Sequence, residues 1–515
     1  MIERSFRSHF CSLTRHLLLL LTAFLCLFIT VARADATLPT LLADHMVIQR
    51  GLPVHVWGMA TPQEAVSVTF RGETNSGTAD DLGRWSIYLS PGEAGGPFQL
   101  SIKATNIIVL SDILVGDVWV ASGQSNMEFP MTGLVNADTE IAAAQYPKIR
   151  LFQVNQRPAD YPQENVETKA EAKTWAPCTP ESVAKSSAVA YFFARNLQQK
   201  LGVPIGLIET FWGGTPAESW ISLRSLSADA SLMPVFSARA KTVDSQSSTV
   251  LQLQREETQL QQAIAQATAD GQPIPSRQWH PNFAAWAPAA LYNGMIAPLT
   301  PFAIRGVIWY QGEANSGPDR APLYARLFQT MIRDWRSAWG EGDFPFLFVQ
   351  IANWNTTPEA LWPEVRDAQR KALALKSTGM VVTIDIGDPI DIHPKNKQDV
   401  GLRLSLAARA IAYGEKIEWS GPLYRQLTQE DHALRVWFDH AAGLMAKGGA
   451  ATGFEIAGTD GKYSPAEAKI EGASVVVSSA TVAAPVSVRY AWAANPSCNL
   501  FNKDSLPASP FQAPE

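Results

Sequence analysis

Cysteine is scarce in this chain of 515 residues, which has four, and two of them lie within the first 34 positions. The sequence contains no CxxC pair and no cluster of cysteine and histidine, so it indicates neither a zinc site nor a disulfide framework. We therefore predict no metal and no cofactor. Cys178 and Cys498 could form a single disulfide in an oxidising compartment, and the sequence leaves open whether they pair.

Charge is scarce as well, because Asp, Glu, Lys and Arg make up 17% of the residues and the formal net charge is −6 at pH 7. A slightly acidic chain does not attract nucleic acid or anionic lipid, so we expect neither as a partner. The chain is, in contrast, rich in tryptophan, with 16 residues. Sugars stack on indole faces through their C–H groups, so this composition fits a protein that handles carbohydrate, although most indoles are expected in the core.

The first 34 residues have the pattern of a secretory signal peptide. Three arginines precede an apolar run from Leu17 to Val31, and Ala32-Arg33-Ala34 then forms an A-x-A cleavage site. The run is short for a membrane span, so we predict cleavage, no membrane association of the mature protein, and a secreted or periplasmic location. The alternative is an uncleaved N-terminal anchor, because Arg33 is unusual beside a cleavage site.

The remaining chain divides into three parts. Residues 35–116 alternate short apolar runs with Gly and Pro turns and predict a small β-sandwich. Residues 117–414 predict an α/β domain, a parallel sheet flanked by helices, with a Gln-rich surface insertion at about 244–290. Residues 415–515 predict a second β module. In the α/β domain we expect strands at 118–121, 149–154, 205–210, 306–310, 346–350 and 380–386, and helices at 186–200, 322–339, 363–375 and 397–413.

A serine and a histidine follow two of these strands. They are therefore expected at the carboxyl edge of the sheet, where α/β proteins have their active sites. Ser125, in Gly123-Gln124-Ser125-Asn126-Met127, would be a nucleophile whose own backbone N–H is the first oxyanion donor, although a plain turn or helix-cap serine is the alternative. His393 would accept its proton. Asp391 is our choice for orienting the imidazole. Three rivals remain, namely Asp388, which could instead initiate a turn, Asp385 and Glu313.

Two further segments could complete such a site. The paired glycines of Trp212-Gly213-Gly214 allow a close backbone approach, so Gly214 or Gly213 could supply a second oxyanion donor, and a tight strand-to-helix turn is the plain alternative. The Gln311 amide is the first choice for a third donor and Asn315 the second. Glu313 could contact substrate, orient a neighbour, or be an ordinary network carboxylate. The residues expected to stack on sugar are Trp212, Trp220, Trp279 and Trp286.

Taken together, the motifs GQSNM, WGGTPAESW, LYNGMIAPL, WYQGEAN and DIHPKNKQDVGLRL resemble those of the sialate O-acetylesterase family and its relatives among SGNH-type carbohydrate esterases, over roughly residues 38–414. The resemblance implies an SGNH-hydrolase-like fold and a serine esterase that removes O-acetyl groups from sugars through an acetyl-enzyme. It implies Ser125, His393 and Asp391 as the triad, with Ser125, Gly214 and the Gln311 region as oxyanion donors. Gln311-Gly312-Glu313 departs from the usual Gly-x-Asn, and the GxSxG elbow of α/β-hydrolases is absent because Met127 stands in place of its second Gly.

The resemblance implies two substrates. Sialate O-acetyl esters are suggested by the nearest named family, and acetylated plant polysaccharide, such as xyloglucan or xylan, is the alternative. A sialic acid site should also offer a cation to the carboxylate, for which Arg277 and Arg305 are candidates. A third hypothesis is an inactive carbohydrate-binding protein, and the intact Ser125 and His393 argue against it.

Overall fold

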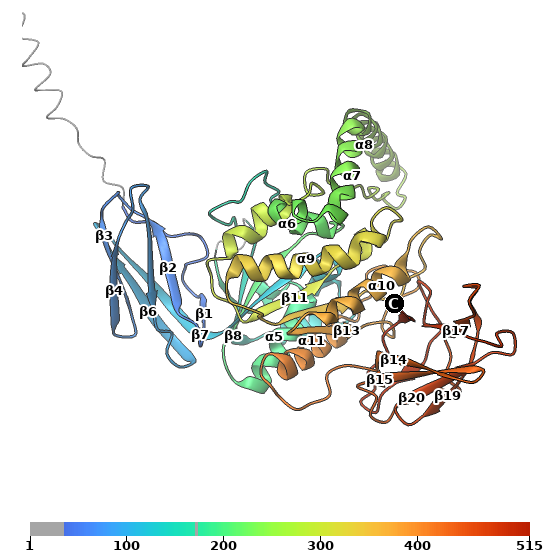
Figure 1. Cartoon of the computed structure of the whole chain (residues 1–515). Helices are drawn as coiled ribbons and strands as arrows, with labels where there is room; N and C mark the ends of the chain where they lie inside the picture. Colours follow the sequence, from blue (N-terminus) through green and yellow to red (C-terminus); the bar gives the residue numbers. More distant parts are fainter. Residues whose placement is uncertain (1–34, 170–173, 515) are drawn as a thin grey trace, which may run out of the picture.

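The computed structural model describes residues 35–169 and 174–514, and the predicted signal peptide lies outside these ranges. At its centre lies a sheet whose strands are ordered β13-β12-β11-β7-β10-β8-β9, with helices packed against it (Figure 1). All neighbours along this path are parallel except β8 and β9. The predicted α/β fold, a parallel sheet flanked by helices with additional β modules, is confirmed. The strands are β7 (Ile107–Gly123), β8 (Tyr146–Gln153), β9 (Ala176–Cys178), β10 (Ile205–Phe211), β11 (Gly306–Tyr310), β12 (Phe346–Gln350) and β13 (Thr378–Val382).

Continuous apolar sequence explains why these strands are central, since both faces of the sheet are covered. On one face Trp119 of β7 packs against Phe193, with ring centroids 5.1 Å apart, and on the other Trp309 of β11 packs against Trp335 at 5.7 Å. The predicted strand at 380–386 instead ends at Val382, because the Ile386 N–H donates to the Thr383 carbonyl and closes a turn. The covering helices are α5 (Ala188–Leu201), α9 (Ala321–Trp339), α10 (Trp362–Lys371) and α11 (Lys397–Ile411).

The N-terminal β module and the α/β domain share one strand, β7, which is 17 residues long. Its first part pairs with β6 and β1 as far as Gly116, and its second part pairs with β10 from Asp117 onward. The change of partners falls at the predicted boundary between residues 116 and 117, and the strand is continuous across it. This continuity fixes the module against the domain. Its other strands are β1 (Val47–Gln49), β2 (Val54–Met59), β3 (Ala65–Phe70), β4 (Glu73–Thr78), β5 (Arg84–Leu89) and β6 (Gly95–Lys103).

Two further parts complete the chain. Helices α7 (Met233–Asp244) and α8 (Gln246–Ala269) form the surface insertion, which projects from the domain in Figure 1 and begins earlier than predicted. The C-terminal module is tied to the domain by the buried Arg366, which donates to the carbonyls of Ala352 and Ala494. Its main strands are β14 (Leu423–Glu430), β15 (Ala433–Asp439), β17 (Phe454–Ala457), β19 (Glu467–Glu471), β20 (Ser474–Ser478), β21 (Ser487–Tyr490) and β23 (Phe511–Ala513).

The two cysteines that follow the predicted signal peptide, Cys178 and Cys498, are free thiols. Within residues 35–169 and 174–514, no helix has the length and apolar character needed to cross a membrane.

Candidate active site

Three adjacent strands deliver the predicted site segments to one edge of the sheet. Gly123, at the end of β7, lies in register with Phe211 at the end of β10 and with Tyr310 at the end of β11. The backbone of Gly123 has φ +139°, and a Cβ there would lie 2.1 Å from the Tyr310 carbonyl oxygen. Only glycine fits this close approach. The turn that follows β7 is therefore held directly against the neighbouring strand.

Ser125 is the first residue of the short helix α2 (Ser125–Glu128) and is partly exposed. Its backbone N–H, like those of any first helical turn, has no carbonyl to bond within the helix. Gly213 lies beside its side chain, because a Cβ on that glycine would lie 3.3 Å from the Ser125 Cβ. The structure thus brings together the predicted nucleophile and the paired-glycine turn.

Asn126 joins the serine turn to the histidine loop. Its Nδ2 donates to the carbonyl of Ile392, the residue before His393, at 3.0 Å and to Glu313 Oε1 at 2.7 Å. Its Oδ1 accepts from Lys397 Nζ at 2.5 Å. Because Asn126 and Lys397 are almost fully buried, with exposed fractions of 1% each, these contacts are shielded from water and hold the residues beside Ser125 and His393 together.

His393 and Asp391 lie on the same loop, with Nδ1 and Oδ1 3.8 Å apart. The same Asp391 oxygen accepts the backbone N–H of His393 at 2.9 Å. Their side chains are 38% and 44% exposed, so the pair lies at the rim of the site rather than inside the core. The 3.8 Å separation is an ion-pair contact and not a hydrogen bond, so the role of Asp391 in orienting the imidazole stays a prediction.

The three rival carboxylates have other partners. Asp385 makes a bidentate ion pair with Arg403, and Asp388 accepts the backbone N–H of Ile390, as a turn aspartate does. Glu313 accepts from Asn126 and is 7% exposed, so it is a buried network carboxylate. That Glu313 contacts substrate stays a prediction.

The charges around His393 favour its neutral form. Burial lowers the pKa of His393, the Lys397 charge lowers it further, and Asp391 opposes both effects. Burial also lowers the pKa of Lys397 to about 7, while the charge of Glu313 raises it. Burial raises the pKa of Glu313. At neutral pH the imidazole is therefore available as a proton acceptor, which is what a serine nucleophile needs.

Gly214 is the better placed of the two glycines for an oxyanion donor. The Gly213 N–H donates to Glu128 Oε2 at 2.6 Å, whereas none of the described residues accepts the Gly214 N–H. Gly214 has φ +71°, a left-handed conformation that glycine adopts without strain. Gly214 lies next to Gly213, which contacts Ser125, and the oxyanion role of its N–H stays a prediction.

Gln311 does not fit the predicted oxyanion role. It is fully buried, and its Nε2 donates to the Thr215 carbonyl at 3.2 Å and to Asn315 Oδ1 at 2.7 Å. Both amide hydrogens are thus engaged inside the protein. Asn315 is equally enclosed, since its Nδ2 donates to Glu218. The correction applies to both amides, and Gln311 instead braces the Thr215 turn.

Of the four tryptophans predicted to stack on sugar, three are at least partly exposed and one lies in the core. Trp279 is 61% exposed, and its ring lies against Gly214, where a Cβ would approach to 2.3 Å. Trp286 is partly exposed and donates from Nε1 to the Gly214 carbonyl at 2.8 Å. Trp212 is half-buried beside the same turn. Trp220 is fully buried and packs against Trp309, so the prediction that it stacks on sugar is wrong.

A parallel sheet with a serine and a histidine brought to its carboxyl edge is an arrangement suited to ester hydrolysis, and the comparisons with known proteins give the class as a carbohydrate esterase of the SGNH type, which is a carboxylic-ester hydrolase. A family model described as carbohydrate esterase, sialic acid-specific acetylesterase, matches residues 237–412. The sialate O-acetylesterases of Rattus norvegicus and Homo sapiens are each 31% identical to this chain. The alignments cover 91% of this chain and 93% of the rat protein, and 89% and 88% for the human protein. The chain belongs to the sialate O-acetylesterase family.

A solved structure agrees with this assignment. The carbohydrate acetylesterase from Xanthomonas citri has a TM-score of 0.79 and 38% sequence identity, and the match covers 93% of this chain and 99% of that one. The coverage includes the β modules as well as the α/β domain. The family and this neighbour support an acetylated carbohydrate as the substrate class.

Proposed function

We propose that this protein is an exported serine esterase that removes O-acetyl groups from a glycan through an acetyl-enzyme formed on Ser125. The single observation that carries the proposal is the hydrogen bond from Asn126 Nδ2 to the Ile392 carbonyl, because it ties the residue after Ser125 to the residue before His393. The basic, apolar and A-x-A pattern of residues 1–34 supports export.

The reaction proceeds in two steps without change of oxidation state. Ser125 Oγ attacks the acetyl carbonyl carbon while His393 takes the hydroxyl proton, and the backbone N–H groups of Ser125 and Gly214 stabilise the oxyanion. When the ester C–O bond breaks, His393 returns that proton to the sugar oxygen. Water then attacks the acetyl-enzyme with His393 as base, releasing acetate and restoring the serine. Asp391 stabilises the imidazolium that forms in each step.

For the glycan, none of three candidate arginines offers a free cation to a carboxylate at the site. Arg277 pairs with Glu257, and Arg305 precedes β11 and therefore lies at the opposite edge of the sheet from Ser125. Arg320 lies over the Trp286 ring, but its guanidinium is paired with the buried Glu218. A sialate carboxylate would need a cation to bind it. We therefore propose an acetylated neutral polysaccharide, such as xyloglucan or xylan, as the substrate. A sialate O-acetyl ester, named for the curated relatives, is the second candidate.

One preparation of purified mature protein tests both parts of the proposal. Mixing with p-nitrophenyl acetate should give a burst of p-nitrophenol that Ser125→Ala abolishes, with a loss of turnover on the order of 10⁴-fold or more. Acetate release should then be compared for acetylated xyloglucan oligosaccharides, acetylated xylan and O-acetylated sialic acid. Activity confined to the sialate ester would overturn the neutral-glycan proposal, and no acetate from any ester would overturn the esterase.

A further inference from the structure

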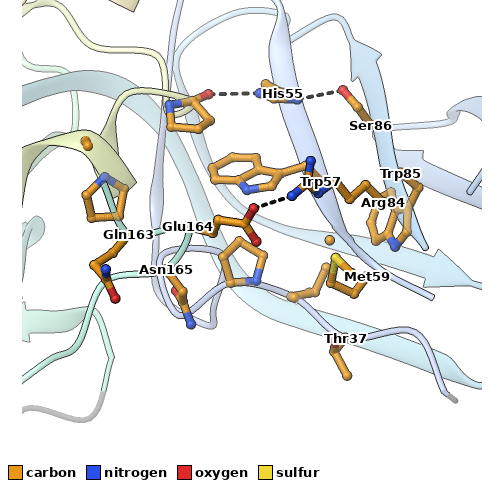
Figure 2. Close-up of a pocket in the computed structure, with 16 residues that line it drawn as sticks. Thr37, His55, Trp57, Met59, Arg84, Trp85, Ser86, Gln163, Glu164 and Asn165 are labelled. Atoms are coloured by element: carbon orange, nitrogen blue, oxygen red, sulfur yellow. Dashed lines mark hydrogen bonds and ion pairs between the residues drawn. The ribbon is translucent and has the colours of Figure 1, made fainter. Parts of the chain in front are cut away.

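A cavity of about 490 Å³ lies between the N-terminal β module and the α/β domain, away from Ser125 and His393. One wall comes from β2 and β5, and the other from residues 163–165 and 297–301 (Figure 2). This volume is in the range of small-molecule sites in proteins. None of the predicted site residues lines it, so the chemistry at the end of the sheet leaves the cavity unexplained.

Two rings of β2, His55 and Trp57, line the module face of this cavity, and Tyr88 of β5 lies beside His55 outside the lining. His55 and Trp57 are two residues apart on β2 and therefore point to the same side, and Tyr88 lies opposite His55 in the register with β5. The His55 ring is stacked on Trp57, with centroids 4.8 Å apart, and on Tyr88 at 4.5 Å. In Figure 2 the Trp57 indole lies in the middle of the lining residues. Flat apolar rings at a concave surface suit the C–H faces of sugar rings.

The polar groups of the lining are suited to hydroxyl groups and carry no unpaired charge. Gln163 and Asn165 come from the α/β domain, on the side of the cavity opposite Arg84 (Figure 2). Asn165 Oδ1 accepts from Thr40 N, and none of the described residues accepts from its Nδ2. Arg84, the one Lys or Arg among the lining residues, is paired with Glu164.

The lining histidine is also uncharged. His55 Nδ1 lies 2.9 Å from the Pro301 carbonyl oxygen and Nε2 lies 2.7 Å from Ser86 Oγ, so both ring nitrogens are engaged. Burial lowers the pKa of His55 and keeps the ring neutral at neutral pH. The walls thus favour an uncharged ligand with many hydroxyl groups over a carboxylate.

One loop, residues 155–169, connects this cavity with the active site. Near its start, Gln156 Nε2 donates to Glu128 Oε1 at 2.8 Å, and Glu128 also accepts the N–H of Gly213 beside Ser125. Farther along, the Gln163 N–H donates to the Asn293 carbonyl, and Gln163 to Asn165 line the cavity.

The geometry points to a second, non-catalytic carbohydrate site in this cavity, one that holds a neutral oligosaccharide segment of the substrate by stacking on Trp57. The inference rests on the proposed function in so far as the substrate is a glycan, but it concerns binding and not ester cleavage. It assigns the N-terminal β module a role in substrate capture.

Isothermal titration of the protein with xyloglucan oligosaccharides and xylan oligosaccharides, both free of acetyl groups, tests the site. Wild type should bind at least one of them, Trp57→Ala should weaken that binding by about tenfold or more, and Trp57→Phe should restore part of it. The matched control is Trp437→Ala, which removes a partly exposed indole from β15 of the C-terminal module and should leave binding unchanged.

Hydrolysis of p-nitrophenyl acetate separates a binding defect from a folding defect, because Trp57 is remote from the reacting groups. Trp57→Ala should keep the wild-type kcat/KM on this ester while its KM for acetylated polymer rises. The inference is overturned if wild type binds neither oligosaccharide, or if Trp57→Ala binds as wild type does. If the esterase proposal alone were wrong, oligosaccharide binding through Trp57 would persist without acetate release.

Discussion

Removing the charge of Asp391 is the most informative perturbation of the triad. Its Oδ1 lies 3.8 Å from His393 Nδ1. At such a distance two unit charges interact by about 1 kcal/mol in water and about 4 kcal/mol at an effective dielectric constant near 20. Both side chains are roughly 40% exposed, so an intermediate value applies. We assign about 2 kcal/mol to the attraction between the Asp391 carboxylate and the His393 imidazolium in the transition state. Asp391→Asn should therefore lower kcat/KM by about 30-fold.

The pH profile makes this prediction specific. Asp391 raises the pKa of His393, so Asp391→Asn should lower that pKa, keep the imidazole neutral in more acidic solution and move the acid limb of kcat/KM to lower pH. A general loss of folded protein would lower the rate without moving the limb. Asp388→Asn is the matched control and should behave as wild type, because Asn retains the oxygen that accepts the Ile390 N–H. An unchanged rate and limb in Asp391→Asn, with a large loss in Asp388→Asn, would refute the assignment.

Three further predictions concern the surroundings of the triad. Lys397→Gln removes the charge that lowers the pKa of His393, so the acid limb of kcat/KM should move to higher pH, and a shift to lower pH would contradict this reasoning. Gly214→Ala places a Cβ 2.3 Å from the Trp279 ring at a positive φ, and should cost on the order of 10- to 100-fold in kcat by displacing an oxyanion donor. Gln311→Ala should lower the free energy of unfolding by about 2–5 kcal/mol in a urea titration, because buried partners lose their hydrogen bonds. A loss of kcat without loss of stability would restore Gln311 as an oxyanion donor.

The sheet was predictable because its strands are apolar on both faces. The runs at 306–310 and 346–350 have the bounds of β11 and β12. Strand β4 cannot be predicted from the sequence, because Glu73–Thr78 is polar and alternates only between partly buried and exposed positions. Such a strand is held by hydrogen bonds to its neighbour β3, which local sequence does not reveal.

Site residues could be predicted where they follow a strand in the sequence. They could not be predicted where their role depends on contacts between distant parts of the chain. Ser125 and His393 could be selected because each follows an apolar run. The buried link of Asn126 to Lys397 joins residues 271 positions apart, and the only local signal was the position of Lys397 four residues after His393 at a helix start. Composition likewise could not separate the buried Trp220 from the exposed Trp279, since burial is a property of the fold.

Peptide mapping of a rapidly quenched reaction tests the central claim most directly. Wild-type protein mixed with p-nitrophenyl acetate and quenched in acid during the burst should carry one acetyl group on the peptide that contains Ser125. The same peptide from His393→Ala, quenched at the same time, should carry little or none, because the serine proton has no acceptor. Acetylation of another residue, or equal acetylation of Ser125 in the absence of the imidazole, would contradict the account.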